Sequence, residues 1–324
     1  MGQTGLVRTA EVDAIAGALG AAVTEARPLA GGFSHETCLL TLAGGERVVV
    51  RLGGPDPAIE AAVMDRAREQ VPVPAVLRVV PAVSEDVRPA MVLEYVAGTP
   101  LSDLLADGGD GMAALGAEVG RVIAGVGGVT FGRPGFFGDR DLGVRAMPPW
   151  SRQLAEFAAN CMDAVPEGRL DRDARRAWAG LCAAHAPALA AVDGQARLVH
   201  ADVNPKNILV TRVRGGWRVD AVLDWEFSFS GCPYADAANM TRFGDEYPGG
   251  FAAGFRAGFT CHQPAGLPLP RDWAYLGHVL DMFALSDLVT RPAGHFVADQ
   301  AAGQIRRWIA VGVPGQPPGP GQPG

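Results

Sequence analysis

The chain has one lysine, Lys206, among its 324 residues, and arginine supplies the rest of its lysine and arginine total. These basic residues are also outnumbered, with 28 against 35 acidic ones, which gives a formal net charge of -7. Proteins that bind nucleic acid hold the phosphate backbone with clustered lysine and arginine side chains. The charge balance therefore argues against a nucleic-acid partner.

Long apolar segments are also missing. No stretch offers about 18 uninterrupted apolar residues, the length that a membrane-spanning helix needs. The N-terminus has neither the basic region nor the apolar core of a secretory leader. We expect a soluble, cytoplasmic protein with no membrane partner, and the sequence leaves its oligomeric state open.

The cysteines are few and lack the spacing of a zinc site or a disulfide framework. No pair forms a CxxC motif, and the residues are scattered along the whole chain. We interpret them as reduced thiols of the protein interior. They are Cys38, Cys161, Cys182, Cys232 and Cys261.

What the chain does contain is the apolar content of a globular enzyme. Hydrophobic residues make up 48% of it and the mean hydropathy is +0.12, which is too apolar for a disordered chain. At 324 residues the chain is long enough for two lobes, because a domain typically takes about 150 residues.

The first 96 residues have the pattern of a small antiparallel sheet with one helix. Short apolar runs alternate with turns, as at Gly44-Gly45, and such pairs are typical of β-hairpins. A helical stretch stops before Pro72 and Pro74, since proline disfavours helix at the residue before it. We expect strands at 37–42, 47–52, 75–80 and 90–96, and a helix at 58–70.

From residue 97 the apolar residues follow helical spacing in stretches rich in alanine, leucine and arginine. Two short β-like runs, 197–199 and 219–223, interrupt them, and each leads into a polar motif. Residues 312–324 form a proline- and glycine-rich tail that we expect to be disordered. The sequence thus predicts an α+β protein with a β-rich N-lobe (1–96) and a larger, mostly helical C-lobe (97–311). Its helices are expected at 101–126, 150–165, 172–192, 271–290 and 297–311.

The motif that indicates chemistry is His200-Ala201-Asp202 with Asn207, followed by Asp224 at the end of the next β-like run. In phosphoryl transfer the protein mainly positions the reactants and neutralises charge. A carboxylate such as Asp202 can accept the proton of an attacking hydroxyl, and the oxygens of Asn207 and Asp224 are ligands that Mg²⁺ prefers. Turn and strand capping would explain either half of the motif alone, but both halves together favour a catalytic site.

These residues resemble the catalytic loop and metal-binding aspartate of the aminoglycoside phosphotransferase and choline kinase group of small-molecule kinases. The resemblance implies a protein-kinase-like, two-lobed fold, with Asp202 as the catalytic base and Asn207 and Asp224 as Mg²⁺ ligands. It also implies that His200 and Asp236 support the loop. The chain departs from the family pattern at Ala201 and Cys232, where the family more often has glycine and aspartate.

The resemblance extends to the N-lobe. A glycine-rich turn lies between two predicted strands, and its backbone N–H groups are suited to approach phosphates. Arg51 stands where many relatives have lysine, and it would contact the α- and β-phosphates while Glu60 orients it. The segment 91–98 resembles the hinge whose backbone binds the nucleobase. The implied nucleotide-binding residues are Gly32, Phe33, Ser34, Arg51, Glu60, Leu93, Glu94 and Val96.

The predicted function is an Mg²⁺-dependent transfer of the terminal phosphate of ATP or GTP to a hydroxyl of a small molecule. The preferred acceptor is an antibiotic, either an aminoglycoside or another hydroxylated natural product such as a nucleoside. A metabolite kinase for choline, homoserine or a sugar is the alternative. A non-catalytic nucleotide-binding module is disfavoured because Asp202, Asn207 and Asp224 are all present, and a protein kinase because no Phe-Gly follows Asp224.

The acceptor pocket is expected to involve the insert 134–150 and the helices after Asp236. Acidic residues there would suit a cationic antibiotic, whereas aromatic residues would stack on a nucleoside or a sugar. The candidate acceptor-binding residues are Lys206, Glu226, Trp150, Asp245, Glu246 and Tyr247.

Overall fold

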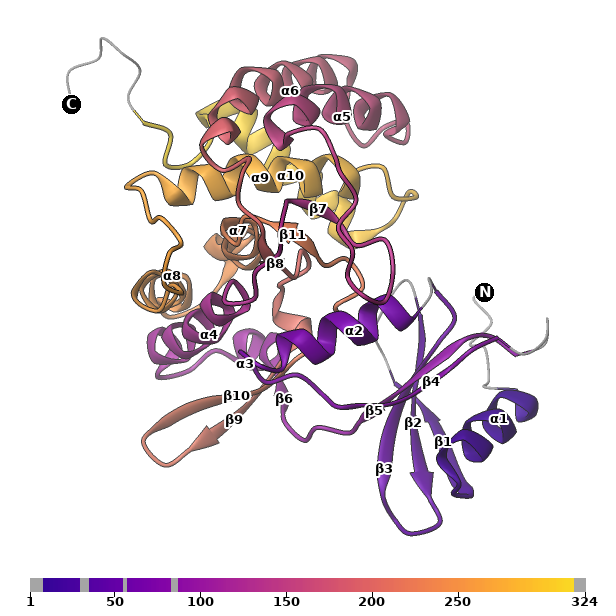
Figure 1. Cartoon of the computed structure of the whole chain (residues 1–324). Coiled ribbons are helices and arrows are strands. Elements are labelled where there is room, and N and C mark those ends of the chain that lie inside the picture. Colours follow the sequence, from indigo (N-terminus) through magenta and orange to yellow (C-terminus); the bar gives the residue numbers. More distant parts are fainter. Residues whose placement is uncertain (1–7, 30–34, 55–56, 83–86, 318–324) are drawn as a thin grey trace.

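The computed structural model describes residues 8–29, 35–54, 57–82 and 87–317. The N-lobe is built on an antiparallel sheet with the strand order β1-β2-β3-β5-β4 (Figure 1). A helix, α1 (Thr9–Leu19), precedes the sheet, and a second helix, α2 (Pro57–Ala67), follows β3. The strands are β1 (Val23–Pro28), β2 (Glu36–Leu42), β3 (Arg47–Leu52), β4 (Val76–Val80) and β5 (Ala90–Glu94).

Two apolar clusters hold this lobe in place. One cluster lies between the sheet and α1, with Ile15, Leu40 and Val50 at its centre. The other runs from α2 and the end of β5 into the C-lobe, so Val63 and Met64 share a core with the C-terminal helices. Because α2 packs on the C-lobe, a buried side chain on α2 is held in place relative to the predicted catalytic loop.

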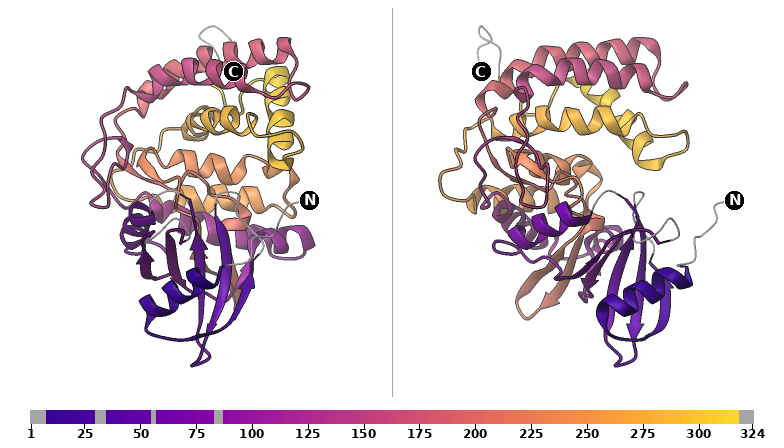
Figure 2. Two further views of the ribbon diagram at one scale, coloured as in Figure 1. Left: turned by 90° about the vertical axis from the view of Figure 1, so that its right-hand side faces the viewer. Right: turned by 45° about the vertical axis from the view of Figure 1, so that its right-hand side comes forward.

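The C-lobe is mostly helical, and its helices α5 and α6 lie at the end of the molecule opposite the N-lobe sheet (Figure 2). Helices α4 and α8 pack closely through glycines: a Cβ atom at Gly116 would lie 2.2 Å from the carbonyl oxygen of Phe251. The helices are α3 (Leu101–Asp107), α4 (Met112–Val126), α5 (Trp150–Ala164), α6 (Arg172–His185), α7 (Tyr234–Thr241), α8 (Phe251–Cys261), α9 (Trp273–Leu288) and α10 (Phe296–Val311).

Two small sheets frame the predicted catalytic segments. Strand β9 (Ile208–Val213) pairs with β10 (Gly216–Val222) and with β6 (Thr99–Pro100). Strand β11 (Phe229–Gly231) pairs with β8 (Arg197–Val199) and with β7 (Gly135–Phe136). The residue after β8 and the residue after β10 lie side by side, since His200 Nε2 is 2.9 Å from the carbonyl oxygen of Leu223.

The structure confirms the α+β class and differs from the expected elements in places. The helix expected at 101–126 is split into α3 and α4, because Gly108, Gly109 and Gly111 adopt positive φ angles that a helix excludes. The helix expected at 172–192 ends at His185 and continues as the 3₁₀ helix Ala186–Ala191. Helix α1 and the strand β9 were not expected.

The tail also begins later than its composition suggests. Val313 is buried, and His278 Nδ1 lies 3.0 Å from the carbonyl oxygen of Pro314. The chain is therefore packed onto α9 beyond residue 312. None of the described helices is both long and apolar enough to cross a membrane.

Candidate active site

The segment after β8 is held in a tight turn by Asp236. This aspartate is fully buried on α7, and its two carboxylate oxygens accept hydrogen bonds from the backbone N–H of His200 (3.0 Å) and of Ala201 (2.9 Å). Burial raises the pKa of Asp236 to about 7, and the two backbone donors oppose this shift. Ala201 adopts a positive φ of 68°, which lets both N–H groups point at one carboxylate.

His200 joins the turn to the end of β10. Its Nδ1 accepts a hydrogen bond from the backbone N–H of Asp202 (3.2 Å), so Nε2 carries the ring hydrogen and donates to the carbonyl oxygen of Leu223 (2.9 Å). Burial lowers the pKa of His200 to about 4, which keeps the ring neutral. A neutral ring with both nitrogens engaged positions the loop and is not free to act as a base.

Asp202 is held by two side-chain amides. Asn204 Nδ2 donates to one carboxylate oxygen (3.1 Å) and Asn207 Nδ2 donates to the other (3.0 Å). Burial, and then the nearby charge of Asp224, raise the pKa of Asp202 to about 6. The carboxylate is therefore ionised at neutral pH and is a stronger base than an ordinary aspartate.

Asn207 and Asp224 supply oxygens of the kind that Mg²⁺ prefers. The backbone N–H of Leu223 donates to the carbonyl oxygen of Asn207 (2.8 Å), so the two segments are tied together next to Asp224. Asn207 directs its amide nitrogen at Asp202, which leaves its side-chain oxygen for a cation. Across the described residues, no group of three or more His, Cys, Asp or Glu side chains could hold a metal. This donor set fits Mg²⁺, which typically takes only one or two protein ligands and completes its shell with phosphate and water.

Arg51 connects the N-lobe to this site. Its guanidinium donates to Glu60 on α2 and to Asp224 Oδ1 at 2.7 Å. Glu60 also accepts a hydrogen bond from the backbone N–H of Trp225 (3.0 Å). Burial raises the pKa of Glu60, and the charge of Arg51 opposes that shift. One buried arginine therefore bridges two carboxylates, one from the N-lobe helix α2 and one from the end of β10.

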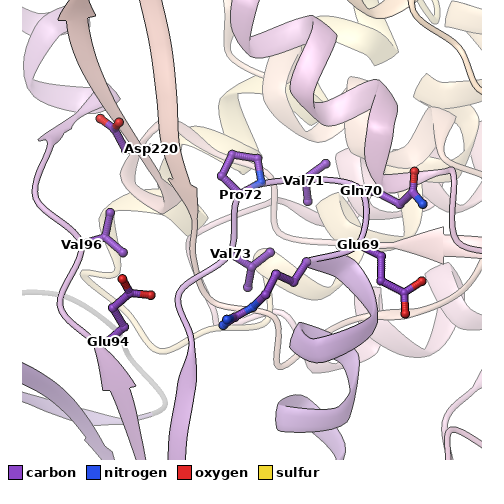
Figure 3. A pocket seen from close by; sticks show the side chains of 9 residues that line it. Glu69, Gln70, Val71, Pro72, Val73, Glu94, Val96 and Asp220 are labelled. Carbon is purple, nitrogen blue, oxygen red and sulfur yellow. The ribbon is translucent and has the colours of Figure 1, made fainter.

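The expected nucleobase segment lies at the end of β5. Leu93 is buried. The side-chain carboxylate of Glu94 accepts a hydrogen bond from the backbone N–H of Ala75 (3.1 Å). Glu94, Val96 and the turn after α2 line an open pocket (Figure 3), whose volume is about 420 Å³. Base contacts through the backbone of this segment stay a prediction, and the expected phosphate-binding residues Gly32, Phe33 and Ser34 lie outside the described residues.

The acidic acceptor candidates are paired within the protein. Asp245 forms an ion pair with Arg307 at 2.5 Å, and Glu246 accepts a hydrogen bond from Gln300 at 3.1 Å. Both partners lie on α10, so these acids are tied to that helix.

The other candidates lie in three settings. Tyr247 is half-buried with its ring edge against Phe251, and Lys206 is exposed in the catalytic loop. Trp150 is 8% exposed and packs among phenylalanine rings.

Comparison with known proteins adds to this geometry. The model of the phosphotransferase enzyme family matches residues 25–274. The chain belongs to this family. A search of curated proteins found no match for it.

The solved structures similar to this phosphotransferase share its fold at low sequence identity. The aminoglycoside phosphotransferase APH(4)-Ia is 17% identical, with a TM-score of 0.69 over 94% of this chain and 100% of that one. A protein assigned as a fructosamine-3-kinase, from Thermobifida fusca, is 16% identical, with a TM-score of 0.60 over 94% and 100% of the two chains. Aminoglycoside 2'-phosphotransferase-IIIa, in complex with GDP, is 14% identical, with a TM-score of 0.60 over 90% and 94%.

The structure of this phosphotransferase brings in residues that the sequence did not single out for these positions. Asn204 lies within the catalytic motif, and its place beside Asp202 was the one local signal available.

His35 Nε2 lies 2.9 Å from Glu226, across 191 positions of sequence. Hydrogen bonding to Glu226 raises the pKa of His35. Arg242, buried and paired with Asp281, brings a positive charge that opposes the raised pKa of Asp202.

The left-handed backbone at Ala201 explains why glycine would fit this position, and it makes a stability prediction. A non-glycine residue at such a φ costs about 1 to 2 kcal/mol. Ala201→Gly is expected to raise the free energy of unfolding by up to about 1 kcal/mol, since glycine also gains freedom in the unfolded chain. Urea denaturation would measure it. Ala179→Gly, at a half-buried helical position in α6, is the control and should lower stability by about 1 kcal/mol. A loss at both positions would show that the strain at Ala201 is negligible.

The Arg51 bridge makes a binding prediction. Charge-assisted hydrogen bonds are worth about 1.5 to 3 kcal/mol, so Arg51→Ala is expected to weaken triphosphate binding by about 10- to 100-fold in calorimetry. Glu60→Gln should give a smaller loss, because Arg51 is still present and is only less well oriented without the charge of Glu60. The double variant should bind no worse than Arg51→Ala, since residues that act as one unit are non-additive.

Arg66→Ala is the matched control for this series. Arg66 lies on α2 but is exposed and pairs with Glu69, so its removal should leave triphosphate binding unchanged. Fully additive losses at Arg51 and Glu60 would separate their roles. If both variants melted at lower temperature with normal binding, the pair would be only a structural salt bridge.

Proposed function

We propose that this phosphotransferase moves the γ-phosphate of ATP or GTP to a hydroxyl of a small molecule, with Mg²⁺ bound at Asn207 and Asp224. The observation that carries the proposal is the arrangement of Asp202. Its carboxylate is ionised at neutral pH, is fixed by two amides and lies beside the metal-ligand pair. A nucleotide would lie between the lobes 1–96 and 97–311.

The residues divide the work of the transfer. Asp202 accepts the hydroxyl proton of the acceptor, whose oxygen forms a bond to the γ-phosphorus as the bond to the β-phosphate oxygen breaks. The nucleoside diphosphate leaves with that electron pair. Arg51 would turn its guanidinium from Asp224 to the α- and β-phosphates, which can accept two charge-assisted hydrogen bonds from it. Bound Mg²⁺ would neutralise the charge that develops on the phosphates.

The acceptor proposed first is an antibiotic with a free hydroxyl, and resistance is the proposed role. Support comes from the similar structure of APH(4)-Ia, one form of which holds ADP and hygromycin B. A metabolite kinase is the second candidate, and the similarity to the fructosamine-3-kinase favours it. Because nucleoside triphosphates are cellular co-substrates, the proposed location is the cytoplasm.

The proposal is tested by nucleotide consumption with Mg²⁺ and either ATP or GTP against a panel of hydroxylated antibiotics and metabolites. At least one compound should stimulate nucleotide consumption. Mass spectrometry should show that this compound has gained about 80 Da, the mass of one phosphoryl group. Asp202→Asn, which keeps the shape of the side chain, should abolish the stimulation. Stimulation that survives in this variant would overturn the assignment of the base.

A further inference from the structure

Aromatic side chains from separate parts of the C-lobe meet in one continuous row. The rings of Phe136 and Phe229 are 5.6 Å apart, those of Phe229 and Trp150 are 5.2 Å apart, and those of Trp150 and Phe283 are 5.7 Å apart. Phe157 on α5 extends the row, 5.3 Å from Phe283 on α9. These five residues are called the aromatic wall.

The aromatic wall begins beside the catalytic loop. Phe229 lies opposite Val199 in the β11–β8 pair, and Val199 directly precedes His200. The hydroxyl of Ser228 donates to the carbonyl oxygen of His200 at 3.5 Å. Strand β11 also follows Asp224 after four residues, so the wall is joined to both the catalytic loop and the metal-ligand segment.

Part of the wall is open to solvent. Phe136 is 46% exposed and Phe157 is 37% exposed, whereas Trp150 between them is buried. Phe227, also 46% exposed, lines with Phe136 a cavity of about 280 Å³ that reaches His35 and Glu226. Exposed aromatic rings gathered beside a site mark a binding surface.

The charges around the wall do not suit a polycation. Residues 133–152, which include Phe136 and Trp150, contain four arginines and two aspartates in a chain that is acidic as a whole. Glu226 is paired with His35, and Asp245 and Glu246 have partners on α10. Beside Phe136 and Trp150, a polyamine acceptor would therefore meet an insert of net positive charge.

We propose that the acceptor is a hydroxylated ring compound without net positive charge, which stacks a flat or apolar face on the aromatic wall. This inference rests on the proposed phosphotransfer and narrows its substrate class. Stacking of a base on an aromatic side chain is worth about 1 to 3 kcal/mol. A small quaternary ammonium ion needs ring faces on several sides, but the wall is a single row whose members also pack on each other.

The first test compares acceptors with wild-type protein, Mg²⁺ and either nucleotide. The panel contains nucleosides and uncharged glycosides, and against them aminocyclitols with several amines, and choline. The best uncharged acceptor is expected to have a kcat/KM at least ten-fold above that of the best cation. Equal or better turnover of a cationic acceptor would overturn the inference while leaving the phosphotransferase proposal standing. If neither group were phosphorylated, both would fall.

The second test changes one ring at a time and measures KM for the acceptor and for the nucleotide separately. Phe136→Leu keeps apolar volume but removes the ring, and it is expected to raise the acceptor KM by about ten-fold, the equivalent of about 1.4 kcal/mol. Phe136→Tyr restores the ring face and should return the acceptor KM to within about two-fold of wild type. Phe157→Leu should also raise the acceptor KM.

The control is Leu269→Ala, on the segment between α8 and α9. Leu269 is 37% exposed, as is Phe157, but it lies outside the wall. Its removal should leave both KM values unchanged. An acceptor KM that Phe136→Leu leaves unchanged, or one that Leu269→Ala raises equally, would show that the wall has a packing role only.

Discussion

Asp202→Ala is expected to lower kcat by about 10²- to 10⁴-fold, the usual contribution of a positioned general base. The loss is expected because Asn204 and Asn207 orient this carboxylate, and alanine has no group that could accept the proton in its place. Nucleotide affinity should change little, since Arg51 and Asp224 are untouched. Steady-state kinetics with a saturating acceptor, together with nucleotide calorimetry, would measure the two effects.

The raised pKa of Asp202 gives the same variant a pH test. With a pKa of about 6 in the free protein, the base is protonated below that pH, so kcat/KM of the wild type should fall as the pH drops through 6. Asp202→Ala should show no fall in this range. Asp173→Ala, which removes an exposed aspartate paired with Arg176, is the control and should behave as wild type. Near-normal turnover in Asp202→Ala would refute the assignment.

Much of the N-lobe could be predicted because its signals are local. The strands at 47–52 and 76–80 follow from short apolar runs between turns, and the hairpin turn between β2 and β3 uses Gly45 at a φ of 82°. Helix α1 gave little signal, because only Glu11 and Ile15 are buried on it and its packing depends on the distant sheet. The α4–α8 contact likewise depends on glycines that are far apart in sequence.

In the candidate site, too, some features can be predicted from local sequence and others depend on contacts between distant residues. Asp202 and Asn207 lie five positions apart in one loop, so the sequence already places them in one motif. The bond from Arg51 to Asp224 spans 173 positions, and only the folded chain shows that the arginine predicted to bind nucleotide contacts the aspartate predicted to bind metal. Asp245 and Glu246 were chosen for their charge, which the sequence shows, while their partners on α10 appear only in the structure. Residue type is local information, but whether a charged side chain already has a partner is not.

Asp224 gives the last prediction, which concerns the metal. Asp224→Asn is expected to abolish the increase in nucleotide affinity that Mg²⁺ produces, because an amide oxygen carries no charge to hold a hard cation against the triphosphate. The backbone should keep its shape: Asp224 adopts a φ of 67°, and asparagine is among the residues that best tolerate this region. Calorimetry with and without Mg²⁺ measures the ratio of affinities, and circular dichroism checks the fold.

A matched control lies on α6, outside the site. Asp173→Asn makes the same change of charge at an exposed aspartate that pairs with Arg176, and it should leave the Mg²⁺-dependent ratio as in wild type. Loss of the Arg51 bond in Asp224→Asn would alter nucleotide affinity with and without the metal alike, so the ratio separates metal binding from the arginine bridge. Mg²⁺-enhanced binding that persists in Asp224→Asn would place the metal on other oxygens, and Asn207→Ala would then be expected to retain it as well.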